Sequence, residues 1–392
     1  MLPSISSSLA TFVALAATVQ SSPAPQGPYS DPWSWTPTTS SAVEVASSSA
    51  AASGVVTALA AAASSTTACN NSPDLCNRNY NNITHMGAHD SAFLRDESTG
   101  NSVSGNQYYN ATVALDAGIR LLQAQVHDLN GAIELCHTTC DLLDAGTLED
   151  WLAKIKTWMD DNPNEVVTIL LVNSDDKTVS DFGTVFENSG IDKYGYTPDG
   201  SGWPTLQTMI DADTRLVTFI AAIDTSTSYS YLLNEWDYIF ETAYDITSLS
   251  GFNCTLDRPS TESSASSAIS AGMMPLMNHF AYSQLAAGIE IPDINDIATT
   301  NSPSTSTTGA LGLHAETCNT DWGTKPTFVL VDFFNEGPAI TTADNQNGID
   351  ATGRKEVDDS SDTETSAGDG LRADNLGKGA LVAFLVAALV MG

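Results

Sequence analysis

The sequence predicts an α/β fold, a TIM-type (β/α) barrel contained in a single domain. Apolar runs of strand length recur between Cys69 and Gly337, and helical patterns separate several of them. This alternation favours a parallel sheet closed into a barrel, whose functional sites lie at the carboxyl ends of the strands. A doubly wound sheet is the alternative, although no glycine-rich phosphate loop follows the first strand.

The predicted strands are short stretches rich in Val, Ile, Leu and aromatic residues. The first lies within Asn82–Phe93, which begins apolar and breaks into small and polar residues. Six more follow along the chain: Ile119–Val126, Val166–Val172, Leu216–Ala222, Tyr238–Tyr244, Met274–Phe280 and Phe328–Phe334.

The clearest predicted helix covers Thr147–Asp161, because its apolar residues fall on one helical face. Thr147 and Asp150 have the spacing of a capping box, and Asn162-Pro163 ends the helix. A second, shorter helix is predicted at Trp203–Ile210.

Both ends of the chain differ in composition from the middle. Leu9–Val19 is apolar but too short to span a bilayer, which indicates a secretory signal, and a Ser/Thr/Ala-rich stalk follows. After an acidic stretch, small residues at Ser366–Gly370, a polar spacer and a short apolar tail have the order of a glycosylphosphatidylinositol (GPI) attachment signal. The predicted divisions are a signal peptide at 1–22, a linker at 23–68, the barrel at 69–340, an acidic disordered linker at 341–370 and a GPI signal at 371–392.

The charge balance limits the possible partners. A formal net charge of −33 arises from 47 acidic and 14 basic residues. Nucleic acid is excluded as a partner because phosphate neutralisation needs clustered Lys and Arg, and purely electrostatic docking on anionic lipid is disfavoured.

Sequons at Asn82, Asn110 and Asn253 agree with a secreted glycoprotein, held at the cell surface by a GPI anchor in the outer membrane leaflet or the cell wall.

Six cysteines behind a secretory signal favour disulfides over free thiols. Sequence proximity favours the pairs Cys69–Cys76, Cys136–Cys140 and Cys254–Cys318, which form one of about fifteen possible connectivities. A zinc site is a weaker alternative, since only Cys136 and Cys140 are close and no second tight pair completes a ligand set.

Two histidines stand where predicted strands end. His89 lies in Gly87-Ala-His-Asp-Ser91 beside Asp90, and His137 lies in Leu135-Cys-His-Thr-Thr-Cys140. Because the ordinary pKa of imidazole is near neutrality, such a pair can supply a general base and a general acid. A structural role is the alternative for each, and we expect it for His85, whose surroundings favour a strand over a metal-binding helix.

These motifs, with Gly118–Gln125 and Phe328–Phe334, resemble the phosphatidylinositol-specific phospholipase C X-domain superfamily, and more narrowly its secreted fungal, GPI-anchored branch of phospholipase C-like phosphodiesterases. The resemblance covers about Cys69 to Gly337. It implies a TIM-type barrel that hydrolyses phosphoric diesters, with a phospholipid or glycerophosphodiester as substrate. His89 matches the general base, His137 the general acid, Asp90 the position beside the base, and Asp332 a strand-end carboxylate that orients a histidine.

The chain departs from the family at Gln123, Gln125 and Asn173, where relatives carry charged groups. Neutral amides are poor sole ligands for a hard dication, so no cofactor is expected, with a shifted Ca²⁺ or Mg²⁺ site at His127 and Asp128 left open. The amides would instead hydrogen-bond the substrate.

Trp236 and Tyr238 are further candidates, for stacking against the substrate ring. Arg120, the nearest cation, is predicted to face away from the site by strand alternation. Because the charged groups of relatives are missing at Gln123, Gln125 and Asn173, the alternative function is that of a catalytically impaired pseudoenzyme, which acts as a cell-wall or ligand-binding module.

Overall fold

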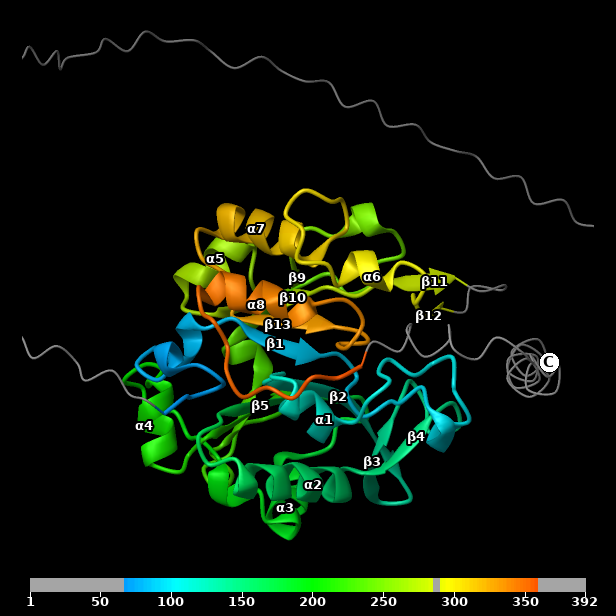
Figure 1. Cartoon of the computed structure of the whole chain (residues 1–392). Coiled ribbons are helices and arrows are strands. Elements are labelled where there is room, and N and C mark those ends of the chain that lie inside the picture. The colour runs from blue at the N-terminus through cyan, green and yellow to red at the C-terminus, as the bar shows by residue number, and fades with distance from the viewer. Residues whose placement is uncertain (1–66, 285–289, 359–392) are drawn as a thin grey trace, which may run out of the picture. The chain divides into compact units, whose positions relative to one another are not determined.

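The computed structural model describes residues 67–284 and 290–358. The predicted signal peptide, most of the stalk and the GPI signal lie outside these residues. Within the described part, parallel strands form one curled sheet with helices packed outside it (Figure 1). The parallel strands are β1 (His85–Ala88), β2 (Leu121–Leu129), β5 (Val167–Asn173), β6 (Leu216–Ala221), β7 (Leu232–Asn234), β8 (Ile239–Thr242), β10 (Met274–Asn278) and β13 (Phe328–Val331).

The order of these strands is that of a barrel. On one side of β1 the neighbouring strands come in chain order, as β2, β5, β6 and β7. On its other side β1 pairs with β13, and β10 and β8 follow. Between the two end strands, the 3₁₀ turn η5 (Glu235–Asp237) contacts both β6 and β8. The predicted barrel-type α/β fold is therefore confirmed, and the doubly wound alternative is not observed.

The helices that cover the sheet are α1 (Ala111–Asp116), α2 (Leu148–Asp161), α3 (Val179–Ser189), α4 (Leu206–Asp211), α5 (Ala265–Ser270), α6 (Ile297–Thr300), α7 (Leu311–Trp322) and α8 (Ala339–Asn347). The helix predicted at Thr147–Asp161 is α2, whose cap Thr147 Oγ1 accepts the Asp150 N–H at 3.1 Å. The second predicted helix begins three residues later than expected, because Trp203 instead packs on Tyr80 inside the barrel, with ring centroids 4.9 Å apart.

Antiparallel strands extend the sheet at two places. The hairpin of β3 (Ala132–Cys136) and β4 (Asp144–Thr147) continues from β2, and β9 (Leu256–Arg258) pairs with β8. A separate ribbon joins β11 (Tyr282–Gln284) to β12 (Glu290–Pro292). None of these strands was among the predicted ranges, because each has at most five residues.

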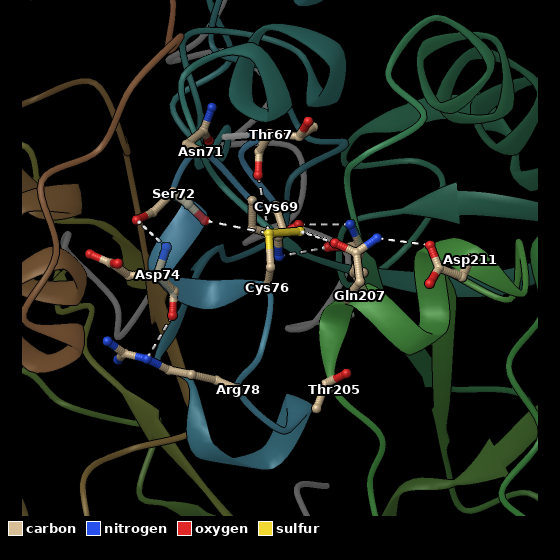
Figure 2. The surroundings of a disulfide bond; sticks show 12 residues. Thr67, Cys69, Asn71, Ser72, Asp74, Cys76, Arg78, Thr205, Gln207 and Asp211 are labelled. Atoms are coloured by element: carbon tan, nitrogen blue, oxygen red, sulfur yellow. Dashed lines mark hydrogen bonds between the residues drawn. A yellow bond between two sulfur atoms is a disulfide. The ribbon is translucent and has the colours of Figure 1, made fainter. Parts of the chain in front are cut away.

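The segment before β1 closes the amino-terminal end of the barrel. Figure 2 shows the Cys69–Cys76 disulfide beside α4, where the Gln207 N–H donates to the Cys76 carbonyl at 2.9 Å. Tyr80 then enters the barrel, and its hydroxyl lies 2.6 Å from Thr168 Oγ1. All three predicted disulfides are present in the structure.

The ordered domain extends beyond the predicted boundary at residue 340. Helix α8 packs on β1, and the Asn347 side chain bonds both backbone groups of Thr84 at 2.9 Å. The Thr352 N–H donates to the Asn71 carbonyl at 2.7 Å, which joins the two ends of the domain. The boundary was wrong because α8 buries small residues, such as Ala339 and Ala343, and has no apolar stripe. Among the residues described, no helix has the length and apolar character needed to cross a membrane.

Candidate active site

A pocket of about 280 Å³ opens where the parallel strands end. Sequence-predicted residues that line it are His89, Asp90, Gln123, Gln125 and His137. Other residues that line it include Glu241, Tyr244, Arg258, Asn278, Phe280 and Tyr282. The pocket thus gathers side chains from β1, β2, β8, β9 and β10 and from the loop after β3.

The His89 side chain is held by contacts at its Nδ1 atom and along one face of its ring. Its Nδ1 lies 2.8 Å from Asp332 Oδ1, at the end of the neighbouring strand β13. Asn106 Nδ2 donates to the same carboxylate oxygen at 3.1 Å. The Phe280 ring stacks on the imidazole, with centroids 3.7 Å apart and planes 6° from parallel. These contacts leave Nε2 as the nitrogen that faces the pocket.

Asp90 connects the two histidines. Its Oδ2 lies 3.6 Å from His89 Nε2 and 3.5 Å from His137 Nε2. Its backbone has φ 46°, a left-handed conformation that Asp tolerates better than most residues, and its N–H donates to Gln123 Oε1 at 2.6 Å. Gln123 therefore holds the loop that directs Asp90 between the imidazoles.

The loop that carries His137 is short and cross-linked. The Cys136–Cys140 disulfide closes it, and the His137 N–H donates to the Leu143 carbonyl at 3.0 Å. Gln125 Oε1 accepts the Thr138 N–H at 2.6 Å, and the edge of the imidazole meets Phe93 with ring centroids 5.2 Å apart. Strand β2 thus positions both histidine loops through its two inward-facing glutamines.

The charges around His89 change its pKa. Burial alone would lower the pKa, but the Asp90 and Asp332 carboxylates outweigh burial and raise it above its ordinary value of 6.5. Proton transfer is most effective when the pKa of the transferring group lies near the working pH. The raised pKa makes the His89 imidazole a stronger base than an ordinary histidine.

Arg258 supplies a cation that the sequence did not reveal. It forms an ion pair with the buried Glu241, which also accepts Asn278 Nδ2–H at 3.2 Å. Its guanidinium lies 4.4 Å from the Tyr244 ring centroid. Glu241, a charged residue inside an apolar strand, was the available signal for this part of the site.

Three predicted binding residues lie elsewhere. The Asn173 side chain closes the turn after β5, with bonds of 3.0 and 2.9 Å to the Lys177 backbone. Tyr238 packs on Trp203 and Phe219, and Trp236 lies under Arg258, 5.6 Å from the guanidinium. None of the three is among the residues that line the described pocket.

The arrangement does not fit Ca²⁺ or Mg²⁺. The two pocket carboxylates do not converge, since Asp90 lies between imidazoles and Glu241 binds Arg258. His127 lies 3.2 Å from Asp175, and Asp128 binds Lys177 at 2.6 Å, so neither contributes to the pocket.

Remaining histidines and Arg120 have other partners. His85 Nε2 lies 3.0 Å from the Tyr80 carbonyl, and Arg120 binds Glu165, away from the pocket as predicted. Cys254, His314 and Cys318 are close enough for a metal, but both sulfurs belong to a disulfide.

Comparison with known proteins assigns the chain to a family. The model of the family PI-PLC X 1 matches residues 75–347, which include His89, His137 and Asp332. The chain belongs to the PI-PLC X family. A PI-PLC X domain-containing protein 1 of Arthroderma benhamiae is 35% identical over 287 residues, 72% of this chain and 90% of that protein. An uncharacterized secreted protein of the same fungus is 35% identical over 275 residues, 69% of this chain and 60% of that protein.

Solved PI-PLC structures show a more distant likeness. A phosphatidylinositol-specific phospholipase C variant from Staphylococcus aureus aligns with a TM-score of 0.47 at 13% identity, over 69% of this chain and 95% of that chain. The enzyme from Listeria monocytogenes aligns with a TM-score of 0.44 at 15% identity, over 69% and 95%.

Proposed function

We propose that this PI-PLC X protein is a secreted, cell-surface phosphoric diester hydrolase of phospholipase C-like type, with a phospholipid or glycerophosphodiester as substrate. The observation that supports this best is the placement of Asp90 Oδ2 within 3.6 Å of the Nε2 atoms of both His89 and His137. Two imidazoles held at one carboxylate, in a pocket that also contains Arg258, can act on the same phosphodiester.

In this proposal His89 is the general base. Asp332 accepts a hydrogen bond from the Nδ1–H of His89. The Nε2 lone pair is then free to take the proton of the attacking hydroxyl. The Asp90 and Asp332 carboxylates then stabilise the imidazolium that forms. His137 acts as the general acid and gives a proton to the leaving alkoxide.

The negative charge that develops on phosphorus-bound oxygens would be met by Arg258. A guanidinium presents planar, paired N–H donors that match phosphate oxygens. Gln123 and Gln125 use their Oε1 atoms for backbone N–H groups, so only their amide N–H groups can reach a substrate. The proposed active site therefore contains a cation, Arg258, although Gln123 and Gln125 on strand β2 are neutral.

Turnover by histidine variants tests the proposal. The full chain, made in a secreting eukaryotic host, would be assayed on phosphatidylinositol micelles and on a glycerophosphodiester, each with EDTA, Ca²⁺ or Mg²⁺. We expect H89A and H137A each to lower kcat/KM by about 10²–10⁴-fold without unfolding the protein. The matched control is H127A, which removes a partly exposed histidine paired with Asp175 outside the pocket. Wild-type rates in H89A would contradict the proposal.

The alternative, a catalytically impaired binding module, draws support from the neutral Gln123 and Gln125 inside the pocket. A folded wild-type protein that cleaves neither substrate under any of these conditions would favour it. Secretion is supported by the relative named as a secreted protein and by the exposed sequon residues Asn82, Asn110 and Asn253. Surface anchoring by GPI would be tested by enzymatic release of the protein from intact cells.

A further inference from the structure

The chain after α8 forms a strap, residues 352–358, that lies along helix α1 (Figure 1). It begins at the amino end of the barrel, where the Thr352 N–H donates to the Asn71 carbonyl at 2.7 Å. The Lys355 N–H then donates at 2.9 Å to the carbonyl of Asp116, the last residue of α1. The strap therefore runs toward the carboxyl ends of the parallel strands.

The strap ends beside the loops of the proposed active site. The Asp358 carbonyl accepts hydrogen bonds from Asn335 Nδ2 at 3.2 Å and from the Tyr109 hydroxyl at 3.4 Å. Asn335 lies three positions after Asp332, and Tyr109 lies three positions after Asn106. Asp332 and Asn106 are the two residues that contact Nδ1 of the proposed base. The chain thus leaves the domain at the catalytic end of the barrel.

Side-chain contacts fix the path of the strap. Arg354 donates two hydrogen bonds to Asp344 of α8, at 2.7 and 2.8 Å, and the Lys355 ammonium lies 2.7 Å from the Asp116 carboxylate. Val357 packs against the hydrophobic core. The point at which the chain leaves the domain is therefore set by the fold.

The large apolar side chains that the described residues expose lie at the same end. They are 36–43% exposed. Val103 and Tyr244 lie in the loops that follow β1 and β8. Leu129 ends β2, and Leu142 lies in the loop that carries His137. Single exposed apolar residues are ordinary, but their common position favours this end for contact with lipid.

The length of chain after the strap limits which end can face a membrane. The proposed GPI attachment region, Ser366–Gly370, begins eight residues after Asp358 and ends twelve after it. Fully extended, a tether of that length reaches about 25–45 Å. A domain of this size is roughly 50 Å across. The tether is therefore too short to pass around the domain and bring its amino end to the membrane.

We infer that the strap and its tether hold the catalytic end of the barrel toward the membrane that carries the anchor. The substrate is then a glycerophospholipid of that same membrane rather than a soluble glycerophosphodiester. This inference rests on the proposed hydrolase function and on the proposed GPI anchor, and it selects one of the two substrate classes that the proposed function includes.

Energy transfer to the membrane measures the orientation without turnover. The full chain, made and anchored in a secreting eukaryotic host, would be reconstituted into vesicles of phosphatidylcholine and phosphatidylinositol that contain an acceptor-labelled lipid. A donor dye would be attached through a non-canonical amino acid in place of Asp245, exposed in the loop after β8, or of Ala271, exposed just before β10 at the opposite end. We expect stronger transfer from position 245 than from position 271.

A longer tether tests whether this geometry matters for hydrolysis. Insertion of about 40 Gly and Ser residues after Asp358 should lower kcat/KM on phosphatidylinositol in these vesicles by about tenfold, since effective concentration falls roughly as the −3/2 power of tether length. It should also abolish the difference in energy transfer. The matched control carries the same insertion after Gly54 in the stalk and should behave as wild type. Hydrolysis of a soluble glycerophosphodiester should be equal in all three proteins.

The inference is overturned if transfer from position 271 equals or exceeds that from position 245. Undiminished hydrolysis of vesicle lipid after the insertion at Asp358 overturns it as well. If wild type cleaves neither substrate, the proposed function fails while energy transfer still decides the orientation. If the protein is recovered without an anchor, the inference fails with the anchor, while turnover on micelles still tests the hydrolase function.

Discussion

His89 is the residue on which the proposed chemistry depends most directly. The sequence identified it, with Asp90, His137 and Asp332, because each lies in a short local motif. Asn106 and Arg258 were missed because their partners are set by the folded sheet. Asp332 lies 226 positions from Asn106, and Glu241 lies 17 positions from Arg258 on the antiparallel neighbour β8.

The first residue-scale prediction concerns Asp332. In D332N the His89 imidazolium loses a buried carboxylate 2.8 Å away, so the raised pKa of His89 should fall. A base works when deprotonated, and the acid limb of the kcat/KM profile should therefore move to lower pH. We also expect a loss of at least about 10²-fold in kcat/KM, because the tautomer is no longer fixed. The pH–rate profile measures both effects.

A matched variant controls for loss of a His–carboxylate pair. D175N removes the charge that lies 3.2 Å from His127, which is outside the pocket. Its profile should follow wild type. An unchanged acid limb in D332N would show that His89 does not set that limb.

At the scale of elements, β1 must approach β2 closely to direct His89 into the pocket. A Cβ on Gly87 would lie 2.8 Å from the Leu121 side chain, much closer than real contacts. G87A should lower the free energy of unfolding by about 1–3 kcal/mol and reduce activity by shifting β1. Chemical denaturation and the turnover assay would measure these effects. In the control G251A the added Cβ has an ordinary 3.4 Å contact, and wild-type stability is expected.

The disulfides allow a second test at this scale. Cys136–Cys140 spans four positions and Cys254–Cys318 spans 64. Loop-closure entropy gives about 2 kcal/mol for the shorter bridge and about 4 kcal/mol for the longer one. C136S/C140S should therefore cost less stability, yet lose activity because the His137 loop is released. Equal activity in C136S/C140S and wild type would show that the disulfide does not position His137.

The prediction of elements succeeded where strands are apolar and buried. It failed for α8, which buries small residues, and for the hairpin of β3 and β4, because β3 has only five residues and β4 is small, polar and exposed. That hairpin matters because it carries His137, whose place could be inferred only from the motif.

At the scale of the whole molecule, stability should depend on a buried histidine outside the pocket. Burial lowers the pKa of His85 to about 4, against 6.5 in an unfolded chain. Between these values the unfolded state binds more protons, so stability conferred by neutral His85 is complete above about pH 6.5 and is lost as the pH falls toward 4. The shift corresponds to roughly 3 kcal/mol.

Denaturant melts of wild type and H85N across this range would measure the effect. The difference in the free energy of unfolding should be constant above pH 7 and should shift against wild type by up to that amount at pH 4. A difference independent of pH would mean that folding does not lower the pKa of His85.

The architecture itself was predictable from the alternation of strands and helices, because a parallel sheet of this length buries both faces and leaves a clear apolar pattern. The ends of the domain could not be predicted from the sequence. Thr352 and Asn71 are joined by a backbone hydrogen bond, which does not depend on the identity of the side chains.

The pairing of β1 with β13 has a consequence for biosynthesis. His89 and Asp332 are separated by 243 positions, so a ribosome finishes nearly the whole domain before the base meets the carboxylate that orients it. Until β13 docks, a nascent chain holds both histidines without the Asp332 carboxylate that contacts His89. In the proposed function, hydrolytic competence therefore arises only after the last strand has been synthesised and has paired with β1.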